Sequence, residues 1–418
     1  MTNEELFERA QQVIPGGVNS PVRAFKSVGG TPYFVARAEG AHVWDVEDHR
    51  YIDLVQSYGA IIAGHAHPAI VDAVQRAAAD GTSYGAPTER EVRLAEAITS
   101  RVPSVELVRL VSSGTEATMS AIRVARGHTG RRTVVKFAGN YHGHGDLLLA
   151  EAGSGLAALG LPGSAGVTEA AVSDTLVVPY NQVPELDDDT ACVIVEPIAA
   201  NMGLVAPADG FLEGLRAACD RVGALLVFDE VITGFRVAFG GAQERTEVTP
   251  DLTTFGKVIG GGLNIGAYGG RREVMQQVSP LGPVYQAGTL SGNPLATAAG
   301  LAALDLLDKA AYATLAHTAE RLATGLRSAF DDAGVTAVVP QVDSLLGVFF
   351  CAEAPVDYAT AQCTDTARYA AFFHALLERG VALAPGAYEV LFPGLAHTGE
   401  VVDEVIAAAR DAAASLAA

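Results

Sequence analysis

Short hydrophobic runs alternate with segments of helical periodicity between residues 107 and 256. The runs read LVRLVSS (107–113), TVVKFAG (133–139), ACVIVEP (191–197), ALLVFDEV (224–231) and DLTTFG (251–256). They are hydrophobic throughout rather than at every second position, which is typical of strands covered by helices on both faces. The pattern therefore predicts an α/β fold built on a large, mostly parallel sheet.

The pattern changes near residue 294. Residues 294–334 are rich in Ala and Leu at helical spacing and predict one long helix that leads into a second lobe. Further on, LLGVFFCAE (345–353) predicts a strand, YAAFFHALLERG (369–380) predicts a helix closed by a glycine, and a last helix is expected from about Glu400. The second lobe is therefore expected to be a smaller α/β unit.

Charge and composition favour small-molecule chemistry. The net charge is −20, from 48 acidic and 28 basic residues, and no basic run indicates a nucleic-acid or acidic-lipid partner. The four cysteines are far apart without a CxxC pair, so we expect reduced thiols. The N-terminus has no signal-peptide pattern and no apolar stretch approaches membrane-spanning length, so the cytoplasm is the expected compartment.

Asp229 stands where one hydrophobic run ends, directly before Glu230. A buried carboxylate is costly unless it faces a partner, and ligands of open parallel sheets bind at the ends of the strands. A turn cap is one interpretation, and a magnesium-binding carboxylate of a nucleotide hydrolase is another. The hydrolase needs a P-loop, but TFGKVIGGG has Val258 where the hydroxyl must be.

Lys257 follows the next hydrophobic run, within a glycine-rich turn. A lone lysine in such a turn is more often an ordinary surface residue. Pyridoxal phosphate, however, needs a lysine to hold its aldehyde as a Schiff base and a carboxylate to keep its ring nitrogen protonated. The pairing with Asp229 therefore predicts a pyridoxal-phosphate site.

The sequence SSGTEA (112–117) predicts a site for the cofactor's phosphate. Ser113 and Glu116 fit the Ser-x-x-Glu capping box that starts a helix, and helix N-termini bind phosphate through free N–H groups. Gly114 and Thr115 would make the contacts, although many ordinary helices begin in the same way. Tyr141, in GNYHGHGD (139–146), could stack on the cofactor ring.

Two His-x-His pairs raise the question of a metal site. They are His65 with His67 and His142 with His144. Neither pair has a nearby cysteine or carboxylate cluster to complete a coordination sphere, so we expect no metal.

Several further motifs resemble the fold-type I pyridoxal-phosphate enzymes of the class III aminotransferase group, along nearly the whole chain. The most specific is IPGGVNSPVRAF (14–25), supported by TSYGAPTERE (82–91), TLSGNPLA (289–296) and APGAYEVLFPGLAHTGE (384–400). These stretches are similar to the aminomutase branch of the group, whose members convert glutamate-1-semialdehyde to 5-aminolevulinate for tetrapyrrole synthesis. The resemblance implies an N-terminal segment (1–60) that joins the small lobe and contributes to the substrate site. It also implies a large cofactor-binding domain with helices on both sheet faces (61–293) and a connecting helix with a small domain (294–418).

The same resemblance implies roles for individual residues. Lys257 would form the Schiff base and transfer protons, Asp229 would meet the ring nitrogen, and Thr289 would reach the phosphate in the neighbouring subunit of a homodimer. The remaining cofactor residues would be Ser113, Gly114, Thr115 and Tyr141. Ser20 and Arg23 would grip the substrate carboxylate, for which a planar guanidinium is well suited. Other residues near the substrate would be Tyr58, Glu196, Asn201 and Glu389.

The implied reaction starts from pyridoxamine phosphate and passes through 4,5-diaminovalerate, which the enzyme has to retain. The small-residue stretch 152–166 is either a lid for this purpose or a surface loop. Two positions depart from the pattern of many relatives, since Tyr58 replaces a tryptophan and Ala200 a glycine. A class III ω-amino acid transaminase is the main alternative, and Ser20 with Arg23 argues against it. A non-catalytic binding protein would not need Lys257, and a partner that delivers the unstable aldehyde is not identifiable.

Overall fold

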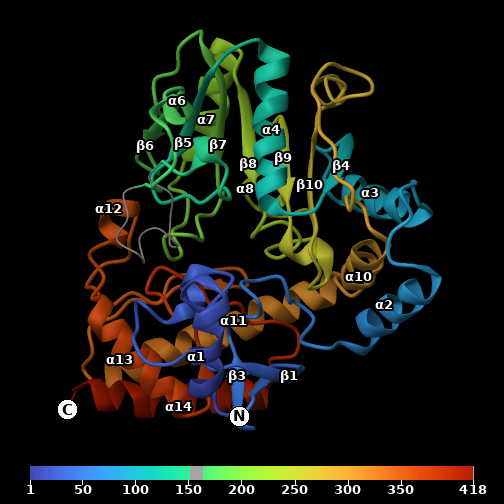
Figure 1. Cartoon of the computed structure of the whole chain (residues 1–418). Coiled ribbons are helices and arrows are strands. Elements are labelled where there is room, and N and C mark those ends of the chain that lie inside the picture. Colours follow the sequence, from blue (N-terminus) through green and yellow to red (C-terminus); the bar gives the residue numbers. More distant parts are fainter. Residues whose placement is uncertain (151–162, 418) are drawn as a thin grey trace.

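A seven-stranded sheet forms the centre of the larger lobe (Figure 1). The computed structural model describes residues 1–150 and 163–417. The strand order is β4-β10-β9-β8-β7-β5-β6, with β10 antiparallel to both neighbours and the other pairs parallel. The strands are β4 (Leu107–Val111), β5 (Thr133–Phe137), β6 (Thr175–Val178), β7 (Thr190–Val195), β8 (Leu225–Asp229), β9 (Leu252–Phe255) and β10 (Gly266–Gly270). The predicted α/β fold with a large, mostly parallel sheet is confirmed.

Helices cover both faces of this sheet, which explains the unbroken hydrophobic runs. On β8, Leu225 and Val227 pack in the same cluster as helix α4 (Gly114–Thr129). The alternate residues Leu226 and Phe228 pack in the cluster of helix α7 (Phe211–Val222) on the other face. Shorter helices of this lobe are α6 (Glu169–Val172), α8 (Ala242–Thr246) and α9 (Arg272–Met275).

The smaller lobe joins the two ends of the chain (Figure 1). Its sheet has the order β1-β2-β3-β13, and the parallel pair of β3 and β13 links the N-terminal and C-terminal segments. Phe25 and Ile52 share one buried cluster with residues of the C-terminal helices. The elements are α1 (Asn3–Val13), β1 (Val35–Glu39), β2 (His42–Asp45), β3 (Arg50–Asp53), β13 (Val381–Ala382), α12 (Tyr358–Ala361), α13 (Thr366–Leu377) and α14 (Gly399–Ala417).

The predicted connecting helix is two helices, α10 (Pro294–Asp305) and α11 (Lys309–Asp332). Asp308 starts the second one, because its side chain accepts a hydrogen bond from the N–H of Ala311 (2.8 Å). Helix α10 packs against α2 (Pro68–Asp80) and α3 (Glu89–Arg101) of the larger lobe. The prediction of one helix was wrong because the Ala/Leu pattern continues across this cap.

The predicted strand at 345–353 is also wrong for most of its length. Only β12 (Leu345–Leu346) pairs in a ladder, with β11 (Gln341–Val342), and Phe349 forms an isolated bridge to Val338. Residues 345–350 are all buried, so the run is hydrophobic because it lies in the interior.

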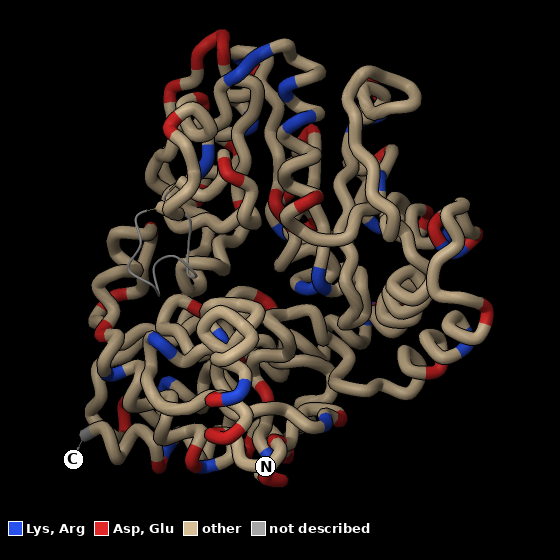
Figure 2. The backbone as a smooth tube through the Cα atoms, viewed as in Figure 1, with Lys and Arg blue, Asp and Glu red and all other residues tan. Residues whose placement is uncertain are grey.

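Charged residues of both signs are spread over the two lobes (Figure 2). Among the described helices, none is long and apolar enough to cross a lipid bilayer.

Candidate active site

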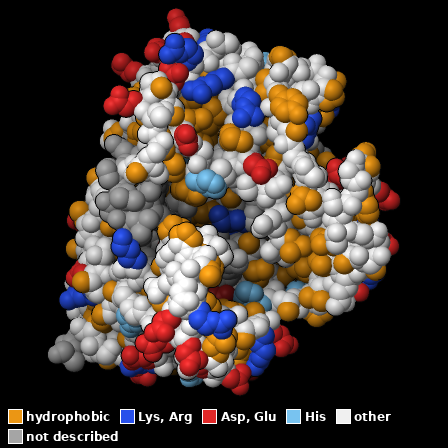
Figure 3. Space-filling model, in the orientation of Figure 1, with side chains coloured by type: hydrophobic (Ala, Val, Ile, Leu, Met, Phe, Trp, Pro, Cys, Tyr) orange, Lys and Arg blue, Asp and Glu red, His pale blue; other side chains and the backbone are white. Residues whose placement is uncertain are grey.

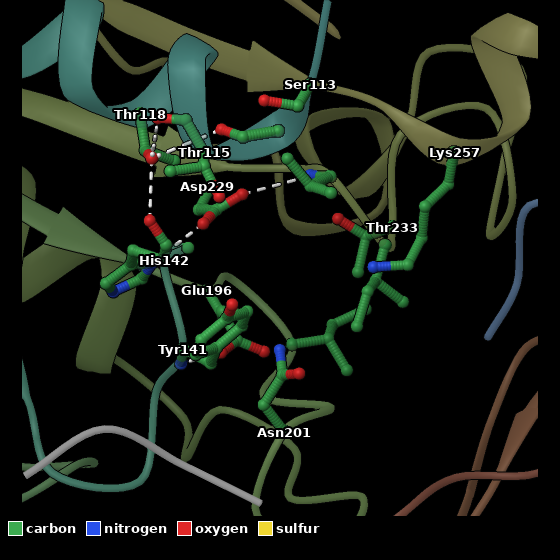
Figure 4. Close-up of a pocket in the computed structure, with 15 residues that line it drawn as sticks. Ser113, Thr115, Thr118, Tyr141, His142, Glu196, Asn201, Asp229, Thr233 and Lys257 are labelled. Atoms are coloured by element: carbon green, nitrogen blue, oxygen red, sulfur yellow. Dashed lines mark hydrogen bonds and ion pairs between the residues drawn. The ribbon is translucent and has the colours of Figure 1, made fainter. Parts of the chain in front are cut away.

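A cavity of about 210 Å³ lies at the carboxyl ends of β4, β5, β7, β8 and β9. In the space-filling view a hollow opens between the lobes, with a basic side chain visible inside it (Figure 3). The cavity brings together eight of the residues singled out from the sequence, from five separate loops (Figure 4). They are Ser113, Gly114, Thr115, Tyr141, Glu196, Asn201, Asp229 and Lys257.

Asp229 is held by three hydrogen-bond donors at the end of β8. One carboxylate oxygen lies 2.7 Å from Nδ1 of His142, and the other accepts bonds from the Val231 N–H (3.1 Å) and the Thr254 hydroxyl (3.0 Å). Burial lowers the pKa of His142, which favours a neutral imidazole that donates from Nδ1. The carboxylate is therefore fixed in orientation and its negative charge is stabilised. Sequence reasoning missed this role of His142, whose only signal was its place in the loop after β5.

The adjacent Glu230 points away from the cavity. It is fully buried and accepts bonds from the Thr233 hydroxyl, the Ala242 N–H and the Gln243 side chain. Burial raises its pKa. Glu230 thus organises the chain from residue 233 to residue 243 and does not line the cavity.

The N-terminus of α4 forms one wall of the cavity. Ser113 caps the helix by accepting a bond from the Glu116 N–H (3.2 Å), as predicted. The return bond differs from a regular capping box, because the Glu116 carboxylate accepts from the N–H of Ser112 rather than of Ser113. A Cβ on Gly143 (φ 82°) would lie 2.5 Å from the Thr115 hydroxyl, so only glycine lets the loop after β5 approach this helix end.

Lys257 begins the short turn η4 (Lys257–Gly260) directly after β9, and its side chain extends into the cavity (Figure 4). Its backbone is left-handed (φ 48°), an unfavourable conformation for a residue with a side chain. Burial lowers the pKa of Lys257, while the carboxylates of Asp229 and Glu196 oppose that change. A lowered pKa increases the fraction of neutral amine, which is the nucleophilic and proton-accepting form.

Glu196 ties two loops of the cavity together. One of its oxygens accepts a bond from the Tyr141 N–H and the other from the Ala200 N–H, both at 2.8 Å. Burial and the nearby Asp229 raise the pKa of Glu196 to about 7. Tyr141, Glu196 and Asn201 lie together on the side of the cavity away from Ser113 (Figure 4). Because Ala200 contributes its backbone N–H here, alanine in place of glycine leaves this contact intact.

A second cavity, of about 560 Å³, contains two of the other four side chains expected near the substrate. Arg23 and Tyr58 line it together with residues of the smaller lobe. Burial and Glu389 raise the pKa of Tyr58, whereas Arg23 opposes the change. Glu389 is buried, and its charge also acts to raise the pKa of Lys257. Ser20 is half-buried at the start of the turn η2 (Pro21–Ala24) and lines neither cavity.

The remaining expectations fall elsewhere. Thr289 is exposed and lines a separate groove with residues 83–88, away from the cavity of its own chain. The candidate lid 152–166 lies mostly outside the described residues. In the described part of the chain no group of three His, Cys, Asp or Glu side chains is arranged to hold a metal. His144 instead contacts the Thr115 hydroxyl (3.2 Å), and His65 pairs with Asp53 (2.7 Å).

Comparison with known proteins assigns the chain to a family. Residues 25–412 match the family model described as aminotransferase class-III. The chain belongs to the class III aminotransferases. A glutamate-1-semialdehyde 2,1-aminomutase from Laribacter hongkongensis (strain HLHK9) is 54% identical over 422 residues, covering 99% of each chain. One from Syntrophobacter fumaroxidans (strain DSM 10017 / MPOB) is 54% identical over 415 residues, covering 97% of this chain and 96% of its own.

Solved class III aminotransferase structures with two different activities superpose well on this chain. An omega-transaminase from Sphaerobacter thermophilus has a TM-score of 0.89 at 34% identity, covering 98% of this chain and 97% of its own. A glutamate-1-semialdehyde-aminomutase from Pseudomonas aeruginosa PAO1 has a TM-score of 0.88 at 26% identity, covering 99% and 94%. The backbone of a class III aminotransferase therefore does not by itself separate the two reactions.

Proposed function

We propose that this protein is an aminomutase that converts glutamate-1-semialdehyde, (S)-4-amino-5-oxopentanoate, to 5-aminolevulinate in tetrapyrrole biosynthesis. The observation that carries the proposal is the 54% identity, over nearly the full length, to enzymes with this name. A transaminase is the second candidate, supported by the 34% identity to the omega-transaminase. The higher identity over an equal length favours the aminomutase.

The cavity fits pyridoxal 5′-phosphate and its amine form, pyridoxamine 5′-phosphate. One related structure is a PLP internal aldimine form, and another is a complex with PMP. Here the open N–H groups of α4 at Gly114 and Thr115 suit a phosphate, and Asp229 suits a protonated ring nitrogen. When bound, the cofactor supplies an electron sink that makes a C–H bond next to its nitrogen acidic.

The residues of the chain would supply binding and proton transfer. Lys257 would accept a proton at Nζ from one carbon and return it to another, a role that its lowered pKa supports. Asp229, oriented by His142, would stabilise positive charge on the ring nitrogen, and Tyr141 would cover the ring. Arg23, with Ser20, would bind the substrate carboxylate through a planar pair of donors.

The reaction needs no second substrate, because the aldehyde carbon would gain one amino group and the neighbouring carbon would lose one, so that the amine form of the cofactor is regenerated overall. The free intermediate, 4,5-diaminovalerate, has to turn around within the site and bind again through its other amine. Glu389, coupled to both Lys257 and Tyr58, and the pocket residues Glu196 and Asn201 are the side chains proposed to face it. A carboxylate beside two amines favours retention of the diamine.

We further propose that the enzyme is cytoplasmic and a homodimer, in which Thr289 reaches the phosphate site of the neighbouring subunit. The exposure of Thr289, and its place in a groove away from its own cavity, support this arrangement.

The test is to supply purified protein with glutamate-1-semialdehyde and no added amino donor or acceptor. We expect 5-aminolevulinate to accumulate over many turnovers, and a visible absorption band from the lysine-bound cofactor that is absent in Lys257→Ala. A reaction that stops after one half-turnover, until a second amine or keto acid is added, would instead identify a transaminase.

A further inference from the structure

Residues 56–59 form a left-handed turn that carries Tyr58. The φ angles are 45° at Gln56, 53° at Ser57, 53° at Tyr58 and 90° at Gly59. The turn is closed by bonds from the Gly59 N–H to the Gln56 carbonyl (3.1 Å) and from the Ala60 N–H to the Ser57 carbonyl (3.3 Å). Left-handed backbone is unfavourable for each residue other than glycine, because the Cβ crowds the following carbonyl oxygen. Surrounding contacts therefore have to hold the turn in place.

Asp53 holds the N-terminal side of the turn. One oxygen of its carboxylate accepts bonds from the N–H groups of Val55 (2.9 Å) and Gln56 (3.2 Å). The other lies 2.7 Å from Nε2 of His65. These contacts fix the entry to the turn but do not reach Gly59.

Arg236 holds the other side. Its guanidinium donates to the carbonyls of Gly59 (3.0 Å) and Ile61 (3.2 Å), and to that of Pro393 (3.5 Å) in the smaller lobe. It also lies 5.2 Å from the ring centre of Phe392, against which Gly59 packs so closely that a Cβ would come within 2.7 Å. Arg236 thus joins the turn to the C-terminal segment.

The burial of Arg236 is unusual for a cation. Its exposed fraction is 0%, and it forms no ion pair with any described carboxylate. Burial lowers the pKa of Arg236 to about 10, so it remains charged at neutral pH. A buried charge without an opposite charge costs several kcal/mol and persists only where fixed dipoles replace water. Here the dipoles are the three carbonyls that it orients.

The backbone of the segment that carries Arg236 is held by two side chains from the C-terminal part of the chain. Tyr312 donates its hydroxyl hydrogen to the Phe235 carbonyl (2.9 Å), and Ser344 donates to the Arg236 carbonyl (3.1 Å). Glu230, next to Asp229 on β8, organises the start of the same segment through Thr233. Arg236 therefore connects the strand that carries Asp229 to the turn that carries Tyr58.

We propose that Arg236 is a positioning residue that holds the left-handed turn of residues 56–59 and so fixes Tyr58 against the substrate. The proposal rests on the proposed function, because the substrate in question is the five-carbon amino aldehyde. Without Arg236 the strained turn is free to relax, and Tyr58 loses its place beside Arg23 and Glu389. Substrate binding is expected to suffer more than proton transfer at Lys257, which lies in the other cavity.

The first test compares Arg236→Met with the wild-type holoenzyme. We expect KM for glutamate-1-semialdehyde to rise roughly tenfold to 100-fold, kcat to change less, and the cofactor absorption band to persist. Arg236→Lys, which keeps the charge, should recover part of the loss. Arg327→Met is the matched control, because it also replaces an arginine that donates to a backbone carbonyl (Val339, 3.1 Å) but leaves Arg236 and the turn untouched, and its KM should equal that of the wild type. An unchanged KM in Arg236→Met would overturn the proposal.

A double-mutant cycle asks whether Arg236 acts through Tyr58. In a Tyr58→Ala background, adding Arg236→Met should change KM by less than about twofold, because the two substitutions remove the same interaction. Gly59→Ala, whose Cβ would come within 2.7 Å of Phe392, should reproduce the KM effect with Arg236 intact. Gly59→Ala also replaces Arg236→Met as the test variant if Arg236→Met does not fold. A full effect of Arg236→Met in the Tyr58→Ala background would show that Arg236 acts elsewhere.

Hydrogen exchange tests the role of Arg236 independently of the proposed reaction. Amides of residues 56–61 should exchange faster in Arg236→Met than in wild type, whereas those of β8 should not. This measurement needs no substrate, so it tests the turn even if no 5-aminolevulinate forms. Equal exchange in the two proteins would contradict the role of Arg236.

Discussion

Asp229 and Glu230 are adjacent carboxylates with different surroundings, because successive residues of a strand point to opposite faces of the sheet. Asp229 shares the face of α4 and reaches the cavity, where His142, Val231 and Thr254 leave one side of its carboxylate toward a ligand. The Glu230 carboxylate accepts its hydrogen bonds from residues 233 to 243 of the same chain. Hence only the first carboxylate is in a position to do chemistry.

We expect different effects on activity when the carboxylates of Asp229 and Glu230 are replaced by neutral amides. Asp229→Asn should lower kcat/KM by about 100-fold or more, because a neutral amide does not stabilise charge on the ring nitrogen. Glu230→Gln should lower the free energy of unfolding by about 1–3 kcal/mol, because one acceptor becomes a donor that faces other donors. Its activity per folded molecule should be retained. Urea titrations and steady-state kinetics of both variants check this, and an inactive but stable Glu230→Gln would contradict it.

Which site residues are predictable from the sequence depends on how local their signals are. Three site residues stand at or just after the ends of hydrophobic runs, beside glycines or a helix cap: Lys257, Asp229 and Ser113. Because these runs are strands of one mostly parallel sheet, the fold class already predicts that the three residues meet at one sheet edge. Arg236 has no such signal, since its partners are backbone carbonyls more than 150 residues away in the sequence. The sequence does not reveal the left-handed turn of residues 56–59 either, because its strain is compensated by tertiary contacts.

At the scale of elements, β10 shows how packing overrides propensity. Its sequence GAYGG is a poor strand former and was not anticipated, yet all five residues are buried. A Cβ at Gly266 would lie 2.2 Å from the Ser113 carbonyl, and one at Gly270 would lie 2.1 Å from the Asp251 carbonyl. The glycines let β10 fit between β4 and β9, and the sequence alone does not reveal that requirement.

Substituting Gly266 should therefore disturb the N-terminus of α4. We expect Gly266→Ala to lower the free energy of unfolding by about 1–3 kcal/mol, because backbone atoms have to move to accept the methyl group. Affinity for pyridoxamine phosphate should fall as well, since Ser113 caps the helix that we propose to bind the phosphate. Gly145→Ala is the control, because a Cβ there meets nothing within 4 Å and its φ of −68° suits alanine. Equal cofactor affinity in the two variants, measured by titration of the apoprotein, would refute this account.

At the scale of the molecule, the site draws on segments from the whole chain. The cavity at the sheet edge uses loops between residues 113 and 257, whereas the second cavity joins Arg23 and Tyr58 to Leu383 and Pro385. In the proposed function the two lobes would contribute separately, with cofactor chemistry on the larger one and substrate recognition where the chain ends meet. Ser20, Glu389 and Thr289 are not among the residues that line either cavity, and Thr289 lies in a separate groove.

If Thr289 completes the phosphate site of a neighbouring subunit, two defective chains should repair each other. A Lys257→Ala chain lacks the lysine but offers its Thr289, and a Thr289→Ala chain keeps the lysine but lacks the donated hydroxyl. In a mixed dimer, isolated with two different tags, one site combines Lys257 from one chain with Thr289 from the other. We expect about half of the wild-type activity per dimer at limiting cofactor, because one site of two is intact. Either parent dimer alone should be less active under the same conditions. If Thr289 instead served its own chain, the mixed dimer would contain no intact site around Lys257 and its activity would not exceed that of the Thr289→Ala parent.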